Sequence, residues 1–208
     1  MKNLLAKNLF LLILLLSLFS AFSFAQTQIE QEILKEINTV RQNPQIYIAH
    51  LEEFKKLFRG KTVEYPENIL MTNEGTSAVD EAIKFLQKQA KLEPLTYSAG
   101  LTKPAKLQLN DLLENYSLGH TGKDGSDLPK RISRFGKYNK LASENVIDQM
   151  SNPKDIVMLM IVDDGVKSRG HRKNIFNKTF KLAGVAYEVN SNNMPVTVMV
   201  FADSFVEK

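Results

Sequence analysis

The apolar residues change their spacing along the chain, and this change restricts the fold more than any other feature of the sequence. Near the C-terminus, residues 182–189 and 196–205 are rich in valine and have strand character, with Ser191-Asn192-Asn193 between them as a turn. Before them, apolar residues recur at helical spacing, as at Ile29, Ile33, Ile37 and Val40. We therefore expect helices followed by an antiparallel hairpin, an α+β arrangement in which helices pack on a small sheet.

Capping residues and prolines predict where the elements begin and end. Asn43-Pro44 and Asn152-Pro153 each combine a capping side chain with a proline suited to the first helical turn. Asn73, Ser98 and either Ser126 or Asp127 are further candidates for helix N-caps. Together these signals predict helices over 29–41 and 46–58, a loop over 60–71, helices over 73–91 and 98–116, a helical turn over 129–135, a strand over 141–147 and a helix over 153–163.

The N-terminus has the composition of a secretory signal peptide. Lys2 and Lys7 accompany a long apolar run, and Ser23-Phe24-Ala25 places small residues at the positions that a signal peptidase reads. The alternative is an uncleaved membrane anchor, but the apolar run is near the lower length limit for spanning a bilayer. We expect a signal peptide over residues 1–25, one domain over residues 26–208, and a secreted or periplasmic protein.

Neither charge nor cysteine chemistry identifies a partner. The whole chain has 27 basic and 23 acidic residues, and loss of the two lysines in residues 1–25 leaves 25 basic residues and a net charge near +2. This excess gives no reason to expect nucleic-acid binding. The chain has no cysteine, so no disulfide stabilises it and no thiol can act as nucleophile or ligand. We expect a monomer without a membrane span after residue 25.

Polar residues that could form a site gather between residues 118 and 175. His120 and His171, two of the three histidines, lie there beside glycines, with Glu144 between them and Asp163-Asp164 before the second. Two imidazoles with carboxylates could bind a divalent transition metal, act as an acid–base centre, or form a hydrogen-bonded framework that holds the loops. The spacing is loose, and no His-Glu-x-x-His helix is present. His50, on the second predicted helix, is interpreted as a surface or half-buried side chain.

Other kinds of site have less support. Ser126 and Ser143 are near the histidines in sequence, but neither lies in a nucleophile-elbow pattern. The glycines between residues 119 and 125 do not have the spacing of a phosphate-binding loop. Large apolar side chains could line a groove for an apolar ligand or fill the core: Phe54, Phe58, Phe85 and Tyr116.

Several short motifs follow one another in an order that resembles a known family: Asn38-Thr39-Val40-Arg41 with Asn43-Pro44, Leu92-Glu93-Pro94-Leu95, His120-Thr121-Gly122 with Asp124-Gly125-Ser126, Arg131 to Gly136, Ser143-Glu144-Asn145, Gly170 to Ile175, and Phe180 to Val185. They resemble the CAP superfamily, which includes cysteine-rich secretory proteins, insect antigen 5 and plant pathogenesis-related 1 proteins. The resemblance covers nearly the whole chain after the predicted signal peptide. It is greatest for the cysteine-free bacterial branch.

The resemblance implies a three-layer α-β-α sandwich with a cleft that holds two histidines and two acidic residues. By position, His120 and His171 match the histidines and Glu144 matches one acidic residue. Asp163 or Asp164 replaces the other. We assign the expected metal ligands as follows: His120, Glu144, Asp164 and His171. The chain departs from the family at Ser143, where the family has glycine, and it lacks the family's tryptophans and disulfides.

The resemblance also implies what the cleft binds. It implies zinc or another divalent metal, or a lipid, a sterol or an extracellular protein as ligand. The alternative is a metal-dependent, peptidase-like hydrolase that uses the same cleft. The catalytic candidates are then His120, Glu144 and His171, although no established catalytic motif accompanies them.

Overall fold

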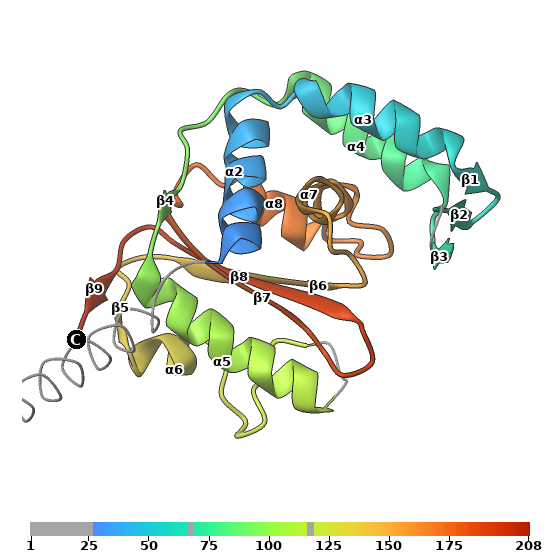
Figure 1. Cartoon of the computed structure of the whole chain (residues 1–208). Helices are drawn as coiled ribbons and strands as arrows, with labels where there is room; N and C mark the ends of the chain where they lie inside the picture. Colours follow the sequence, from blue (N-terminus) through green and yellow to red (C-terminus); the bar gives the residue numbers. More distant parts are fainter. Residues whose placement is uncertain (1–26, 66–68, 116–118) are drawn as a thin grey trace, which may run out of the picture.

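A four-stranded sheet lies at the centre of the fold (Figure 1). The computed structural model describes residues 27–65, 69–115 and 119–208. The strands lie side by side in the order β4 (Thr96–Tyr97), β7 (Leu182–Val189), β8 (Pro195–Ala202) and β6 (Ala142–Asp148). β7 and β8 form the antiparallel hairpin that the valine-rich segments predict, β6 pairs antiparallel with β8, and β4 runs parallel to β7. β6 is therefore one edge of this sheet.

Helices cover both faces of the sheet. On one face lie α5 (Ala99–Asn115) and α6 (Leu128–Ser133), and on the other lie α2 (Gln28–Gln42), α7 (Pro153–Val162) and α8 (Gly170–Ile175) (Figure 1). Successive side chains of a strand point to opposite faces, so each strand contributes to two apolar cores. On β8, Val198 and Val200 belong to the core under α5, whereas Met199 and Phe201 belong to the core under α2 and α7. The fold is the expected α-β-α sandwich.

A helix pair with a small sheet extends from one side of the sandwich (Figure 1). It consists of α3 (Ile46–Lys56), α4 (Thr76–Lys88), and the antiparallel strands β1 (Phe58–Arg59), β2 (Thr62–Glu64) and β3 (Ile69–Met71). The prediction of a loop over residues 60–71 is therefore wrong. The three strands are two or three residues long, and among their residues only Phe58 and Val63 are buried. Such short strands contain no alternating run from which a sequence can predict them.

Three of the predicted N-caps are confirmed. Asp127 accepts a backbone hydrogen bond at the start of α6, and Asn152 accepts two at the start of α7. Ser98 Oγ accepts the Leu101 N–H at 3.2 Å at the start of α5. Asp127 and Asn152 fix the first turns of the helices that bracket β6, which is why they matter for the site.

The caps predicted at Asn43 and Asn73 are wrong. Asn43 is the C-cap of α2, and α3 begins only after Gln45, without a side-chain cap. α4 begins after Gly75, whose φ of +64° is a left-handed conformation that suits glycine, and it ends at Lys88 rather than at residue 91. The Asn73 N–H donates instead to a carboxylate from the turn after α7. The right residue type is present at both places, but Asn43 ends the preceding helix and Asn73 contacts a distant segment, so each helix begins later.

Some predictions fall outside the described residues. The predicted signal peptide over residues 1–25 and the side chain of Tyr116 are among them. In the part of the chain that the structure describes, no helix has both the length and the apolar character needed to cross a bilayer.

Candidate functional site

Glu144, at the middle of β6, forms the first of two His–carboxylate pairs. His120 Nδ1 lies 3.0 Å from Glu144 Oε1, and Arg131 Nη2 donates to Oε2 at 2.7 Å. The Glu144 side chain is 2% exposed and that of Arg131 is fully buried, whereas the His120 side chain is 59% exposed. The result is an accessible imidazole on a buried carboxylate whose two oxygens both have partners.

Arg131 also holds the loop that carries His120. Because Asp127 caps α6, Arg131 lies one turn into this helix and faces the loop. Its Nη1 donates to the carbonyl oxygens of His120, at 3.0 Å, and of Ser126, at 2.9 Å. A buried ion pair needs such additional hydrogen bonds, since desolvation of the two charges is otherwise unfavourable. The guanidinium thus joins the His120 loop to the sheet.

Asp163 forms the second pair, with His171. It is the C-cap of α7 and has a left-handed φ of 55°. Its Oδ1 lies 2.8 Å from His171 Nδ1, and its Oδ2 accepts the His171 backbone N–H at 2.9 Å. The Asp163 side chain is 1% exposed and that of His171 is 23% exposed. The backbone of Asp163 therefore ends α7. Its carboxylate accepts a backbone N–H in the first turn of α8 and orients the second imidazole.

Two asparagines connect the pairs across the edge strand β6. Asn145 Nδ2 donates to the His171 carbonyl at 3.1 Å, and Asn174 Nδ2 donates to Asn145 Oδ1 at 2.7 Å. Because successive side chains of a strand alternate, Glu144 faces α6 while Asn145 faces α7 and α8. The two His–carboxylate pairs therefore lie on opposite sides of β6 and are joined through neighbouring residues of that strand.

Both imidazoles have the same orientation. In each, Nδ1 meets a carboxylate, which favours the tautomer with the proton on Nδ1 and leaves Nε2 as the acceptor when the ring is neutral. No described residue forms a hydrogen bond with either Nε2 atom. The chemically available atoms of the two pairs are thus the two Nε2 nitrogens.

The structure brings Asp163, and not Asp164, to His171. Asp164 accepts the backbone N–H groups of Asn73, at 2.6 Å, and Glu74, at 2.8 Å, and so connects the turn after α7 to the start of α4. The left-handed conformation of Asp163 turns the chain, so the two consecutive carboxylates point to different partners. Asp164, which we expected as the fourth ligand, therefore contacts the start of α4, and Asp163 is the carboxylate beside His171. Over residues 27–65, 69–115 and 119–208, no group of three or more His, Asp or Glu side chains is arranged to hold a metal ion.

Ion pairs to α4 fix the helix that carries His171. The buried Arg172 donates to both Glu81 oxygens at 2.7 Å, and Arg169 donates to both Glu74 oxygens at 2.7 Å. The Arg169 guanidinium lowers the pKa of Glu74 to about 2, and Arg172 lowers the pKa of Glu81. These bidentate pairs hold α8 against α4 and so restrict where the imidazole can lie.

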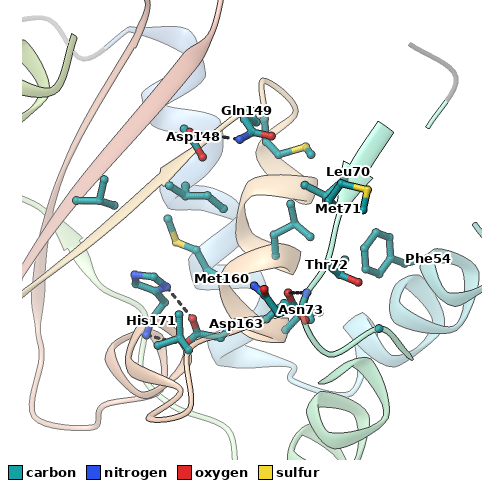
Figure 2. Close-up of a pocket in the computed structure, with 18 of the residues that line it drawn as sticks. Phe54, Leu70, Met71, Thr72, Asn73, Asp148, Gln149, Met160, Asp163 and His171 are labelled. Atoms are coloured by element: carbon teal, nitrogen blue, oxygen red, sulfur yellow. Dashed lines mark hydrogen bonds and ion pairs between the residues drawn. The ribbon is translucent and has the colours of Figure 1, made fainter. Parts of the chain in front are cut away.

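An apolar cavity of about 390 Å³ adjoins the second pair (Figure 2). His171 and Asp163 lie at one end, Met160 in the middle, and Asp148 and Gln149 at the other end. Phe54 and Phe58, which we considered as groove or core residues, line it as well. His120 and Glu144 are not among its lining residues, so only one of the two pairs faces this cavity.

Sequence reasoning missed the residues that join and position the pairs. Arg131, Asn145 and Asn174 all lie inside the motifs that carry the family resemblance, but none was predicted to have a role. Burial distinguishes Arg131 and Asn145 from the other polar residues of these motifs, since both are fully buried. Full burial of a polar side chain is uncommon and cannot be read from the sequence.

Comparison with known proteins finds a family model that matches most of the chain. Residues 34–201 match the model of the CAP family, described as the cysteine-rich secretory protein family. The chain is 31% identical over 101 residues to the uncharacterized protein YkwD of Bacillus subtilis (strain 168). The matched stretch covers 49% of this chain and 37% of YkwD. The chain thus spans little more than a third of the length of this relative.

The similar solved structures are more distant in sequence. An outer surface protein from Borrelia burgdorferi is 20% identical with a TM-score of 0.47, and the match covers 72% of this chain and all of that one. An extracellular protein containing an SCP domain from Bacillus anthracis str. Ames is 23% identical with a TM-score of 0.41, over 53% of this chain and 34% of that one.

Proposed function

Because the chain belongs to the CAP family of cysteine-rich secretory proteins, we propose that it is an extracellular binding domain that holds an apolar ligand in the cavity beside α7. The observation that carries this proposal is the position of the His171–Asp163 pair in the wall of an otherwise largely apolar cavity. Ligand sites of this kind combine an apolar lining with a few polar groups that orient the ligand.

The lining suits a lipid-like body. Met71, Met150 and Met160 line the cavity together with leucine, valine and phenylalanine side chains. Unbranched methionine side chains adapt to ligands of different outline. At the polar end, the contact between His171 Nδ1 and Asp163 favours the tautomer that donates from Nδ1, so Nε2 is an acceptor for a hydroxyl group. We therefore expect a ligand with an apolar body and a hydroxyl group at its His171 end, such as a sterol.

Two residues of β3 supply a matched pair of variants. Ile69 and Met71 are 67% and 71% exposed and lie on the same face of this strand, but only Met71 lines the cavity. A lysine at either position is tolerated by the fold because both side chains are already in water. Met71→Lys places a charge at the cavity and should weaken ligand binding, whereas Ile69→Lys should not.

The test is titration of the purified protein with dehydroergosterol, a fluorescent sterol, and with a fluorescent fatty acid for comparison. We expect saturable sterol binding that Met71→Lys weakens severalfold, since a bound sterol would remove the added ammonium group from water in part. His171→Asn should weaken the sterol more than the fatty acid. Equal binding by the two lysine variants, or no saturable binding at all, would contradict the proposal.

A divalent metal is a second candidate, and the shared ring orientation favours it. Histidine ligands in metal sites commonly donate one ring N–H to a carboxylate and bind the metal through the other nitrogen. His120 and His171 each have this arrangement, so each ring offers Nε2 to a metal while Glu144 or Asp163 orients it. The expected four-ligand set is not formed among the described residues, because both carboxylates are already engaged.

Metal analysis and calorimetric titration with zinc test this second candidate. Specific uptake should be lost in the His120→Ala/His171→Ala double variant and retained in His50→Ala. Absence of specific uptake by the unaltered protein would exclude it. The hydrolase alternative has less support, because among the described residues no serine or threonine hydroxyl forms a hydrogen bond with the His120 or His171 ring, so no activated nucleophile accompanies either one.

A further inference from the structure

The outer edge of β6 is covered in its middle and open towards its end. β6 pairs with β8 on one side only, so it forms an edge of the four-stranded sheet (Figure 1). In the middle of the strand, Asn174 of α8 donates to the Glu144 carbonyl oxygen at 3.4 Å, so α8 closes the edge there. From Val146 onwards the edge borders the cavity beside α7, which residues 146–150 line in succession. The last part of this edge strand is therefore accessible from a cavity.

The register of β6 identifies which main-chain groups face this cavity. The Gln149 N–H donates to the Pro195 carbonyl oxygen at 2.9 Å, so the odd-numbered residues of β6 bond to β8. In an antiparallel pair the alternate residues direct their N–H and C=O groups away from the partner strand, and here these are Val146 and Asp148. Among the described residues, none forms a hydrogen bond with the main chain of either one. The Val146 side chain packs in the core under α5, so its main chain is what lines the cavity.

An extended polypeptide is the ligand whose own groups match this edge. Val146 and Asp148 are two residues apart, which is about 6.6–6.8 Å along a strand, and alternate residues of an added strand repeat at the same interval. The N–H and C=O groups of such a strand can pair with those of both residues, as peptides do when they extend a sheet. β6 contains neither lysine nor proline, which edge strands often use to prevent this pairing.

The cavity offers such a peptide a second kind of contact. Side chains alternate along a strand, so every other side chain of the added strand would point towards Leu159 and Met160 of α7. Met71 lines the same cavity and is 71% exposed, so the cavity opens to the surface at β3. A peptide can therefore reach the edge from solution, and apolar residues at its alternate positions would fill the cavity.

From this combination we propose that the open part of the β6 edge binds an extended peptide segment with apolar side chains at alternate positions, which adds to the sheet as a further strand. The main-chain groups of Val146 and Asp148 supply the pairing, and the cavity selects the side chains. The proposal does not depend on sterol binding, because an apolar ligand cannot pair with these main-chain groups. A peptide whose side chains fill the cavity would compete with a sterol there.

Amide hydrogen exchange followed by NMR tests the pairing residue by residue. The probe is the pentapeptide Lys-Val-Thr-Val-Lys, acetylated and amidated at its ends, whose two valines lie on one face of a strand. In the free protein the Val146 and Asp148 amides should exchange fast, whereas those of Asn145 and Ile147, which bond to β8, should exchange slowly. Saturating peptide should slow exchange at Val146 and Asp148 by about tenfold or more. Saturable binding that leaves both rates unchanged, or no saturable binding up to about 10 mM, would overturn the proposal.

Changes in the peptide and in the protein separate main-chain pairing from apolar packing. N-methylation of the central threonine or of the valine after it removes one N–H in each case, and only one of the two faces β6 in an added strand. One methylated peptide should therefore bind severalfold more weakly and the other about as well as the parent. Asp148→Pro removes an outward N–H at a position where an edge strand tolerates proline, and Asp148→Asn keeps it as the matched control. Asp148→Pro should weaken peptide binding severalfold more than Asp148→Asn.

The remaining outcomes also decide between occupants of the edge. Equal binding by the two methylated peptides would reduce the site to an apolar pocket and contradict the proposal. Protection of the Val146 and Asp148 amides in the free protein that rises with protein concentration would assign the edge to a second copy of this chain and overturn it as well. Thermal unfolding verifies that Asp148→Pro folds, and the peptide series remains decisive if it does not. The sterol is titrated separately, so either proposal can fail without the other.

Discussion

Removing Arg131 should destabilise the protein strongly, because Glu144 would then be a buried charge without its cation. The Arg131 side chain is fully buried and that of Glu144 is 2% exposed. The Arg131 guanidinium donates to Glu144 Oε2 and to two carbonyl oxygens of the His120 loop. Breaking a buried pair by removing one partner typically lowers the free energy of unfolding by about 3–5 kcal/mol. For a domain of this size, Arg131→Met should therefore lower Tm by about 6–20 °C.

Urea unfolding followed by circular dichroism measures this effect, and a second change separates charge from packing. In the Arg131→Met/Glu144→Gln double variant no charge is left unpaired, so part of the lost stability should return. Arg134→Met is the control, because Arg134 lies at the end of the same helix and pairs at the surface with Asp124, the two being 38% and 52% exposed. It should cost less than about 1 kcal/mol. Similar losses for the two arginine variants would refute the reasoning.

Three further outcomes follow from the structure. Asp163→Ala removes the acceptor of the His171 backbone N–H and the partner of the His171 imidazole. It should lower the free energy of unfolding, measured by urea titration, by about 1–3 kcal/mol. Asp163→Asn should have a stability between those of the unaltered protein and Asp163→Ala. The Arg169 guanidinium lowers the pKa of Glu74 from 4.5 to about 2, so this pair's stabilisation is present above about pH 4.5 and is lost as pH falls towards 2. Glu74→Gln should flatten that part of a pH–Tm profile. A Cβ at Gly184 would lie 2.2 Å from the backbone of α5, whereas nothing lies within 4 Å of one at Gly119. Gly184→Ala should lower stability by at least about 2 kcal/mol, and Gly119→Ala by much less.

The elements that could be predicted are those for which local sequence and tertiary contacts favour the same secondary structure. The valine-rich segments become β7 and β8 because both faces of these strands are buried. Asp127 and Asn152 cap helices because a proline next to or near each one favours the first turn. The six-residue helix α8 and the strands β1 to β3 are too short for a periodic signal, so tertiary contacts decide their conformation.

Sequence reasoning named the histidines and carboxylates of the two pairs but not which of them pair with each other. His120, Glu144 and His171 were identified from their polar setting and the family resemblance, and each is found in a His–carboxylate pair. The sequence left Asp163 and Asp164 as alternatives, because one left-handed residue decides which of two adjacent carboxylates points at the imidazole. Arg131 was not predicted to bind Glu144, because an ion pair between a helix and a strand depends on packing that no local pattern encodes.

Long-range proton–nitrogen NMR of the three histidines tests the central claim most directly, because it reports the state of each ring nitrogen. At a pH where the imidazoles are neutral, we predict the Nδ1–H tautomer for His120 and His171, with Nε2 unprotonated in both. Addition of dehydroergosterol should shift the His171 Nε2 resonance and leave those of His50 and His120 in place. An Nε2–H tautomer at His171, or a sterol-induced shift at His120 alone, would contradict the account.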